Sequence, residues 1–199
     1  RCYNNQLNSL VLTKNTALDA LSCYNNRIQR LDLSVNDALS YLNCSNNNLL
    51  SLDVRSSVLN QLIFYNNPRL GAVTCNNTPL KSIDLTQNSA LTFLRCHVNQ
   101  LTSLNTAENA ALKNIYCYEN QLTRLDLTQN SALDVLACRN NLLKALDLTK
   151  NTALTRISCQ SNPSLTSLDI ANGNNTIITN FSALFCENLT CIKVDDDAY

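Results

Sequence analysis

The segment LTRLDLTQNSALDVLACRNNLL, residues 122–143, contains the features that decide the fold. Its leucines are separated by short polar stretches that include one Cys and a small number of Asp and Asn residues. The same pattern, LxxLxCxxNxLxxLDLxxNxA, recurs along most of the chain with a period of 21 residues. A unit of this length is too short to bury its own apolar side, so a continuous core forms only when neighbouring units stack. The repeat therefore predicts a solenoid.

The two apolar stretches of the repeat, LxxLxC and LxxLDL, predict two inward-facing sides in each coil. Within each stretch, inward residues alternate with polar ones, which is typical of a short strand with one buried face. At the strand spacing of about 4.8 Å, about nine such coils give a stack on the order of 40 Å long. We expect a mostly β and loop architecture with parallel strands and almost no helix.

Eight of the ten cysteines occupy one position of the repeat. They are Cys2, Cys23, Cys44, Cys75, Cys96, Cys117, Cys138 and Cys159. One coil has Phe64 at this position, so the position requires an apolar side chain. Stacked neighbours about 4.8 Å apart are too distant for a disulfide, which prefers Cβ atoms about 3.5–4.5 Å apart. A single file of thiols also cannot surround a tetrahedral metal ion, and the sequence has no CxxC pair. We expect free, buried thiols and no metal site.

Asparagine is the expected turn residue, because the chain has only two glycines. An Asn side chain satisfies backbone N–H and C=O groups that a tight turn leaves unpaired, in its own coil and in the next. The residues expected in this structural role after the cysteine include Asn26, Asn47, Asn99, Asn120 and Asn141.

The repeat resembles the 21-residue leucine-rich repeats of internalin J-like bacterial proteins, in which Cys takes one core Leu position, and those of secreted or surface proteins of Bacteroidetes. The stretch NLTCIKVDD, residues 188–196, also resembles the ending of such repeat blocks in Bacteroidetes. The resemblance implies a right-handed leucine-rich repeat superhelix of the α/β-solenoid class. It further implies a secreted or cell-surface location and a non-enzymatic function in binding.

The 21-residue spacing breaks between Cys44 and Cys75, which are 31 residues apart, or one and a half repeats. The extra half repeat, within residues 59–79, is either looped out or kept in the coil with the two sides exchanged. It retains apolar residues such as Phe64 and Leu70, which a solvated loop does not need, so the exchange is preferred.

We divide the chain into a leucine-rich repeat solenoid, residues 1–170, and a C-terminal capping coil, residues 171–199. The capping coil offers apolar cover at Ile178, Phe181, Phe185, Ile192 and Val194. Asp195 to Asp197 repel edge-to-edge stacking. Cys186 and Cys191 lie outside the file of cysteines, and a disulfide between them and a core-filling role for each both remain open.

The composition excludes several classes of partner. The 15 basic and 15 acidic side chains balance, so no charge excess recruits nucleic acid, and no apolar run is long enough for membrane insertion. Catalysis needs a small group of unlike residues in a pocket, whereas this chain repeats files of like residues, so we expect neither an enzyme nor a cofactor. The repeated Asp residues favour pairing with nearby hydroxyls or Lys over calcium binding. They are Asp32, Asp53, Asp84, Asp126, Asp147 and Asp169.

The outward positions that flank the core cysteine predict the binding surface. They vary from coil to coil, whereas the other side repeats LDLTxN almost without change. Exposed Tyr and Arg suit a contact surface, since Tyr carries a large area at low entropy cost. The candidate ligand-binding residues are Tyr24, Tyr65, Arg95, His97, Tyr116, Tyr118 and Arg139. We expect a monomer that binds a protein or glycan through these residues. The alternative is a structural spacer or stalk with no ligand of its own.

Overall fold

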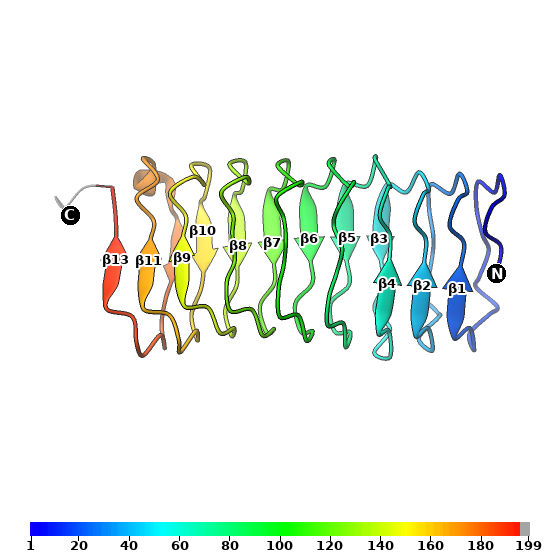
Figure 1. The fold of residues 1–199 in the computed structure, drawn as a ribbon, viewed down its shortest axis with the longest axis horizontal. Coiled ribbons are helices and arrows are strands. Elements are labelled where there is room, and N and C mark those ends of the chain that lie inside the picture. Colours follow the sequence, from blue (N-terminus) through cyan, green and yellow to red (C-terminus); the bar gives the residue numbers. More distant parts are fainter. Residues whose placement is uncertain (196–199) are drawn as a thin grey trace.

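The computed structural model describes residues 1–195, which form a row of stacked coils from the N-terminus to the C-terminal end (Figure 1). Each coil consists of three-residue strands joined by turns. The one helical segment within residues 1–195 is the 3-10 turn η1 (Asn175–Ile177). None of these residues forms a helix long and apolar enough to cross a membrane.

The strands form three parallel sheets. The first contains β1 (Ala20–Ser22), β2 (Tyr41–Asn43) and β4 (Gln61–Ile63). The seven-stranded sheet contains β3 (Ser51–Asp53), β5 (Ala72–Thr74), β6 (Phe93–Arg95), β7 (Asn114–Tyr116), β8 (Val135–Ala137), β10 (Arg156–Ser158) and β12 (Asn180–Ser182). The third contains β9 (Ala145–Asp147), β11 (Ser167–Asp169) and β13 (Cys191–Lys193). This is the parallel-strand leucine-rich repeat solenoid that the 21-residue period predicts.

One continuous apolar core runs through the stack. In β6, Leu94 is buried, whereas Phe93 and Arg95 on either side of it are only partly buried. Leu94 and Cys96 point into the core together, because alternate residues of a strand face the same way. The two-residue alternation of the repeat therefore separates core side chains from surface side chains.

The cysteine file fills space in this core. All ten cysteines are free thiols. Seven of the eight in the file are at most 1% exposed, and Cys2 in the first coil is half-buried. Burial raises the pKa of Cys75 and of Cys117 to about 12, so these thiols stay protonated and unreactive at neutral pH. The prediction of buried, free thiols is confirmed for this file.

Asparagine side chains join consecutive coils at the corners. The Asn120 amide nitrogen donates to the carbonyl of Cys117 in its own coil and to that of Cys96 in the preceding coil, both at 3.0 Å. Its amide oxygen accepts the backbone N–H of Leu101 at 3.0 Å. Four other residues make the same three kinds of contact: Asn26, Asn47, Asn99 and Asn141. The residue before each Asn is left-handed, with φ between 52° and 54°, which is unfavourable for Val98.

The two sides of the coil exchange roles between Phe64 and Cys75. Strand β3, from the LDL half of its repeat, pairs with β5, which precedes Cys75, so that Leu52 lies beside Val73. On the other side, the backbone N–H of Asn67 donates at 3.1 Å to the side-chain oxygen of Asn88, which belongs to an LDL half. The extra half repeat therefore stays in the coil, and the cysteine file passes from one side of the solenoid to the other.

Residues 171–195 continue both sides of the stack. Strand β12 pairs with β10, and β13 pairs with β11. Of the five apolar side chains expected to cover the end, Ile178 is half-buried and packs against the core. The other four are themselves exposed: Phe181, Phe185, Ile192 and Val194 are 40%, 76%, 42% and 40% exposed. Asp195 accepts the backbone N–H groups of Gly173 at 2.6 Å and Asn175 at 2.7 Å, and so secures the last coil. Asp196 and Asp197 lie outside the described residues.

The disulfide between Cys186 and Cys191, left open by the sequence, is not formed in the structure. Cys186 occupies the corner position that Asn fills in other coils. Its half-buried thiol donates to the carbonyl of Cys159 at 3.5 Å, a bond that a corner Asn would otherwise make. Cys191 is exposed on β13.

Candidate functional site

The structure does not bring the seven predicted ligand-binding residues together. Tyr24 and Tyr65 directly follow the core positions after β1 and β4, on the three-stranded sheet. The other five lie on or directly after β6, β7 and β8 of the seven-stranded sheet: Arg95, His97, Tyr116, Tyr118 and Arg139. A single surface made of all seven is therefore wrong, because the exchange of sides separates the first coils from the later ones. Tyr24 instead stacks on Tyr3, with ring centroids 4.6 Å apart.

The five residues that share a face pack against one another across consecutive coils. His97 and Tyr118 are stacked, with ring centroids 4.1 Å apart and an interplanar angle of 9°. The guanidinium of Arg139 lies 4.0 Å from the centroid of the Tyr118 ring. Arg139 also pairs with the Glu119 carboxylate at 3.0 Å. His97, Tyr118 and Arg139 thus form a stack that follows the axis of the solenoid.

Beside this stack, the guanidinium of Arg95 lies over two neighbouring aromatic rings, on the same side of both. Its guanidinium carbon is 5.2 Å from the centroid of Phe93 and 5.4 Å from that of Tyr116. The two rings are 5.8 Å apart and tilted by 47°. We call Phe93, Arg95, His97, Tyr116, Tyr118 and Arg139 the central patch.

Sequence reasoning missed Phe93. It compared only the two outward positions that flank the cysteine. Phe93 occupies the preceding outward position of the same strand, directly before buried Leu94. Other coils have Ala72, Asn114 or Arg156 at this position. An aromatic side chain there was the signal that could have identified Phe93.

The electrostatic field of the central patch is positive around His97. Partial burial lowers the pKa of His97 first, the charges of Arg95 and Arg139 lower it further, and Glu119 opposes them. The Nδ1 atom of His97 is buried and has no hydrogen-bond partner among residues 1–195. His97 is therefore neutral at neutral pH, and two Arg residues face one carboxylate in this patch.

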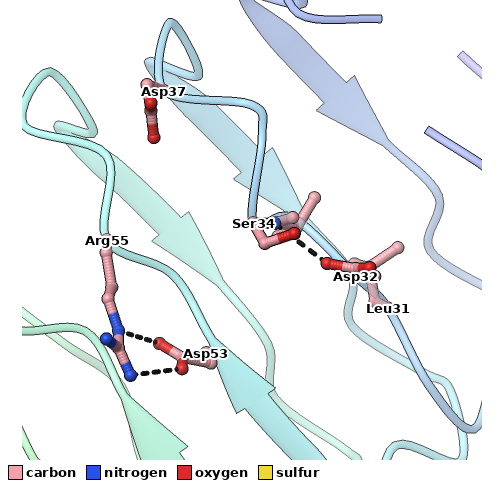
Figure 2. A pocket seen from close by; sticks show the side chains of 7 residues that line it. Leu31, Asp32, Ser34, Asp37, Asp53 and Arg55 are labelled. Atoms are coloured by element: carbon pink, nitrogen blue, oxygen red, sulfur yellow. Dashed lines mark hydrogen bonds and ion pairs between the residues drawn. The ribbon is translucent and has the colours of Figure 1, made fainter. Parts of the chain in front are cut away.

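In a hollow near the N-terminal end of the same sheet, most of the charged side chains already have partners. Figure 2 shows Arg55 directed at Asp53 from β3, with Nε–Oδ1 and Nη2–Oδ2 distances of 2.8 and 2.7 Å. Asp32 accepts the backbone N–H of Ser34 at 3.0 Å, and hydrogen bonds from Ser34 lower the pKa of this carboxyl. Within residues 1–195, no group of three His, Cys, Asp or Glu side chains could hold a metal ion. Of the charged side chains that line the hollow, only the Asp37 carboxylate has no hydrogen bond or ion pair within residues 1–195, so the hollow offers a ligand little beyond this one group.

The comparisons with known proteins agree with this architecture. The functional domain of InlJ from Listeria monocytogenes, which includes a cysteine ladder, matches with a TM-score of 0.60 and 30% identity over 96% of this chain. The chain is a cysteine-containing leucine-rich repeat protein that resembles internalin J. It spans 44% of the length of that structure. No protein-family model matches the chain, and no curated protein matches it.

Two other leucine-rich repeat structures are more remote. An internalin, InlF of Listeria monocytogenes, is 19% identical with a TM-score of 0.49, and the match covers 94% of this chain and 72% of that one. A leucine-rich repeat protein of Leptospira interrogans is 16% identical with a TM-score of 0.49, over 90% of this chain and 61% of that one. Neither bears on the function.

The LDLT side of this leucine-rich repeat protein satisfies its own polar groups. The hydroxyl of Thr128 donates to Asp126, and that of Thr149 donates to Asp147, both at 2.7 Å. Hydrogen bonds from these threonines are the largest causes that lower the pKa of the two carboxyls. Carboxylates held by their own coil leave few free groups for a ligand.

Proposed function

We propose that this leucine-rich repeat protein is a recognition module that binds another macromolecule through the central patch on its seven-stranded sheet. The observation that supports the proposal is the contact network among Phe93, Arg95, Tyr116 and the stack of His97, Tyr118 and Arg139. These contacts hold large side chains in place before a partner arrives.

Such preorganisation matters because ordering a flexible side chain on binding costs about 0.5–1.5 kcal/mol. Arg and Tyr are also among the residues that most often dominate the free energy of binding at protein interfaces. The patch combines both properties on adjacent coils. On the LDLT side, the Asp and Thr side chains instead satisfy one another within each coil.

The resemblance to internalin J extends the proposal to a secreted or cell-surface bacterial protein with a non-enzymatic function. The partner is a protein or a glycan. The alternative function, a spacer or stalk that only holds another domain at a distance, requires no ligand for this segment.

A binding screen against protein and glycan arrays tests the proposal. The double variant Tyr116→Ala/Tyr118→Ala removes two tyrosines from the central patch. The matched control, Tyr24→Ala/Tyr65→Ala, removes two tyrosines from the three-stranded sheet and leaves the patch intact. We expect a partner that binds the natural chain and the control variant but not the patch variant, with unchanged circular dichroism for all three. The absence of any partner, or equal binding by both variants, would favour the spacer.

A further inference from the structure

Arg95 is a cation without a partner inside the chain. Its guanidinium forms no hydrogen bond and no ion pair with any side chain or backbone group of residues 1–195. Arg139, two coils further along the same sheet, is instead neutralised by Glu119 at 3.0 Å. The two arginines of the central patch therefore differ: one is already occupied, and the other is left with all its donors available.

The surroundings of Arg95 favour an anionic group as its partner. Phe93 and Tyr116 lie side by side against the guanidinium and exclude water from part of its surface, which strengthens an ion pair at this point. The planar guanidinium offers parallel N–H groups that match the two oxygens of a carboxylate. The pKa of neighbouring His97 is lowered in part by Arg95 and Arg139, so the local field is positive and attracts an anion.

The geometry of Tyr118 argues against a sugar as the partner. A sugar ring stacks on the open face of an aromatic ring. His97 in the preceding coil covers one face of Tyr118, and Arg139 in the following coil covers the other. Tyr118 therefore presents only the edge of its ring to a partner, and this edge suits hydrogen bonds and side-chain contacts with a protein.

We propose that Arg95, supported by the adjacent rings of Phe93 and Tyr116, binds the carboxylate of an Asp or Glu side chain on a protein partner that lies across the seven-stranded sheet. This inference rests on the proposed function of the central patch and names the class of its partner. The His97, Tyr118 and Arg139 stack forms the rigid edge against which the partner segment packs.

A random-peptide phage library panned on the immobilised chain tests this inference. Peptides selected by the natural chain are expected to share an Asp or Glu residue. One selected peptide is then synthesised with its acidic residue intact and as the corresponding amide. Both forms are measured by fluorescence polarisation against the natural chain and the variants Arg95→Gln and Arg95→Lys. Arg156→Gln, which removes an exposed arginine from the same sheet, is the matched control.

We expect Arg95→Gln to weaken binding of the acidic peptide by about 10-fold or more, and Arg95→Lys by less, because Lys retains the charge but not the planar fork. Binding of the amide peptide should be weak and insensitive to Arg95. Arg156→Gln should bind like the natural chain.

Three results would overturn the inference. Peptides that bind the central patch without an acidic preference, or acidic peptides indifferent to Arg95→Gln, would remove Arg95 as the anchor while leaving the proposed function in place. Glycans that bind the patch while no peptide does would leave that function in place but exclude the protein partner. If no peptide, protein or glycan depends on the patch, both proposals fall.

Discussion

The corner asparagines provide a sharp test of how the coils hold together, and Asn120→Ala is the most informative change. This substitution removes the amide that joins two consecutive coils but leaves the core side chains untouched. The side chain donates to the carbonyls of Cys96 and Cys117 at 3.0 Å and, in a longer contact, to that of Tyr118 at 3.3 Å. It accepts one backbone N–H, that of Leu101. Asn120 is only 9% exposed, so water cannot simply replace it.

The expected loss of stability depends on the hydrogen bonds that each partner of Asn120 retains in the variant. The carbonyls of Cys96 and Cys117 each retain a second amide donor from a neighbouring corner Asn at 3.1 Å, so each lost bond costs roughly 1 kcal/mol. The N–H of Leu101 is left without a partner, which costs about 1–3 kcal/mol. Together the free energy of unfolding should fall by about 3–5 kcal/mol.

Urea unfolding followed by circular dichroism measures this loss, with Asn5→Ala as the matched control. Asn5 occupies the same position of the first coil, but it is exposed and bonds only to carbonyls of its own coil. We expect Asn5→Ala to cost less than about 1 kcal/mol, since water replaces those bonds. Asn120→Thr should fall between the two, because Thr78 shows that a hydroxyl at this position keeps the bond within its own coil, at 2.9 Å. Equal losses for Asn120→Ala and Asn5→Ala would refute the view that the corner amides join the coils.

Three further predictions concern other features of the fold. Under native conditions iodoacetamide should modify Cys191, but it should not modify the seven buried cysteines of the file until the chain unfolds. Mass spectrometry counts the adducts. Rapid labelling of the buried cysteines in the native chain would contradict their packing. Because folding lowers the pKa of His97, its contribution to stability is present above about pH 6.5 and is lost as the pH falls through the folded pKa. The variant His97→Gln should therefore show a smaller decrease in the free energy of unfolding between about pH 7 and 5. An unchanged pH dependence would contradict this. Val98→Asn should raise the free energy of unfolding by about 1 kcal/mol, since Val98 has a φ of 54° and Asn tolerates that region better. The reverse change, Asn140→Val at a φ of 53°, should lower the free energy of unfolding by about the same amount. No change in either variant would show that this turn is unstrained.

The repeat alone predicts most of the fold, because each position has one physical role. Inward leucines, the packed cysteines and the interruption of the spacing can all be read from the 21-residue period. The arrangement of the candidate site could not be read with the same certainty. It depends on whether the half repeat before Cys75 loops out or stays in the coil, and this decides whether Tyr65 and Arg95 share a face. A period in the sequence reports spacing along the chain, whereas a shared surface requires strand pairing.

The partners of individual side chains were also beyond the sequence. Tyr118 was expected as an exposed contact residue, but stacking by His97 and Arg139 covers both faces of its ring. Phe93 was missed because only the two outward positions that flank the cysteine were compared. Stacking contacts between residues 21 apart depend on rotamers, which the repeat does not specify.

The exchange of sides between Phe64 and Cys75 is the claim on which the division of the surface depends, and a ¹³C/¹⁵N-edited NOESY spectrum tests it most directly. The account predicts backbone cross-peaks between Leu52 in β3 and Val73 in β5, since these residues are paired. Cross-peaks between Leu62 in β4 and Val73, with none to Leu52, would mean that the half repeat is looped out. The cysteine file would then remain on one side, and Tyr24 and Tyr65 would share a face with the central patch.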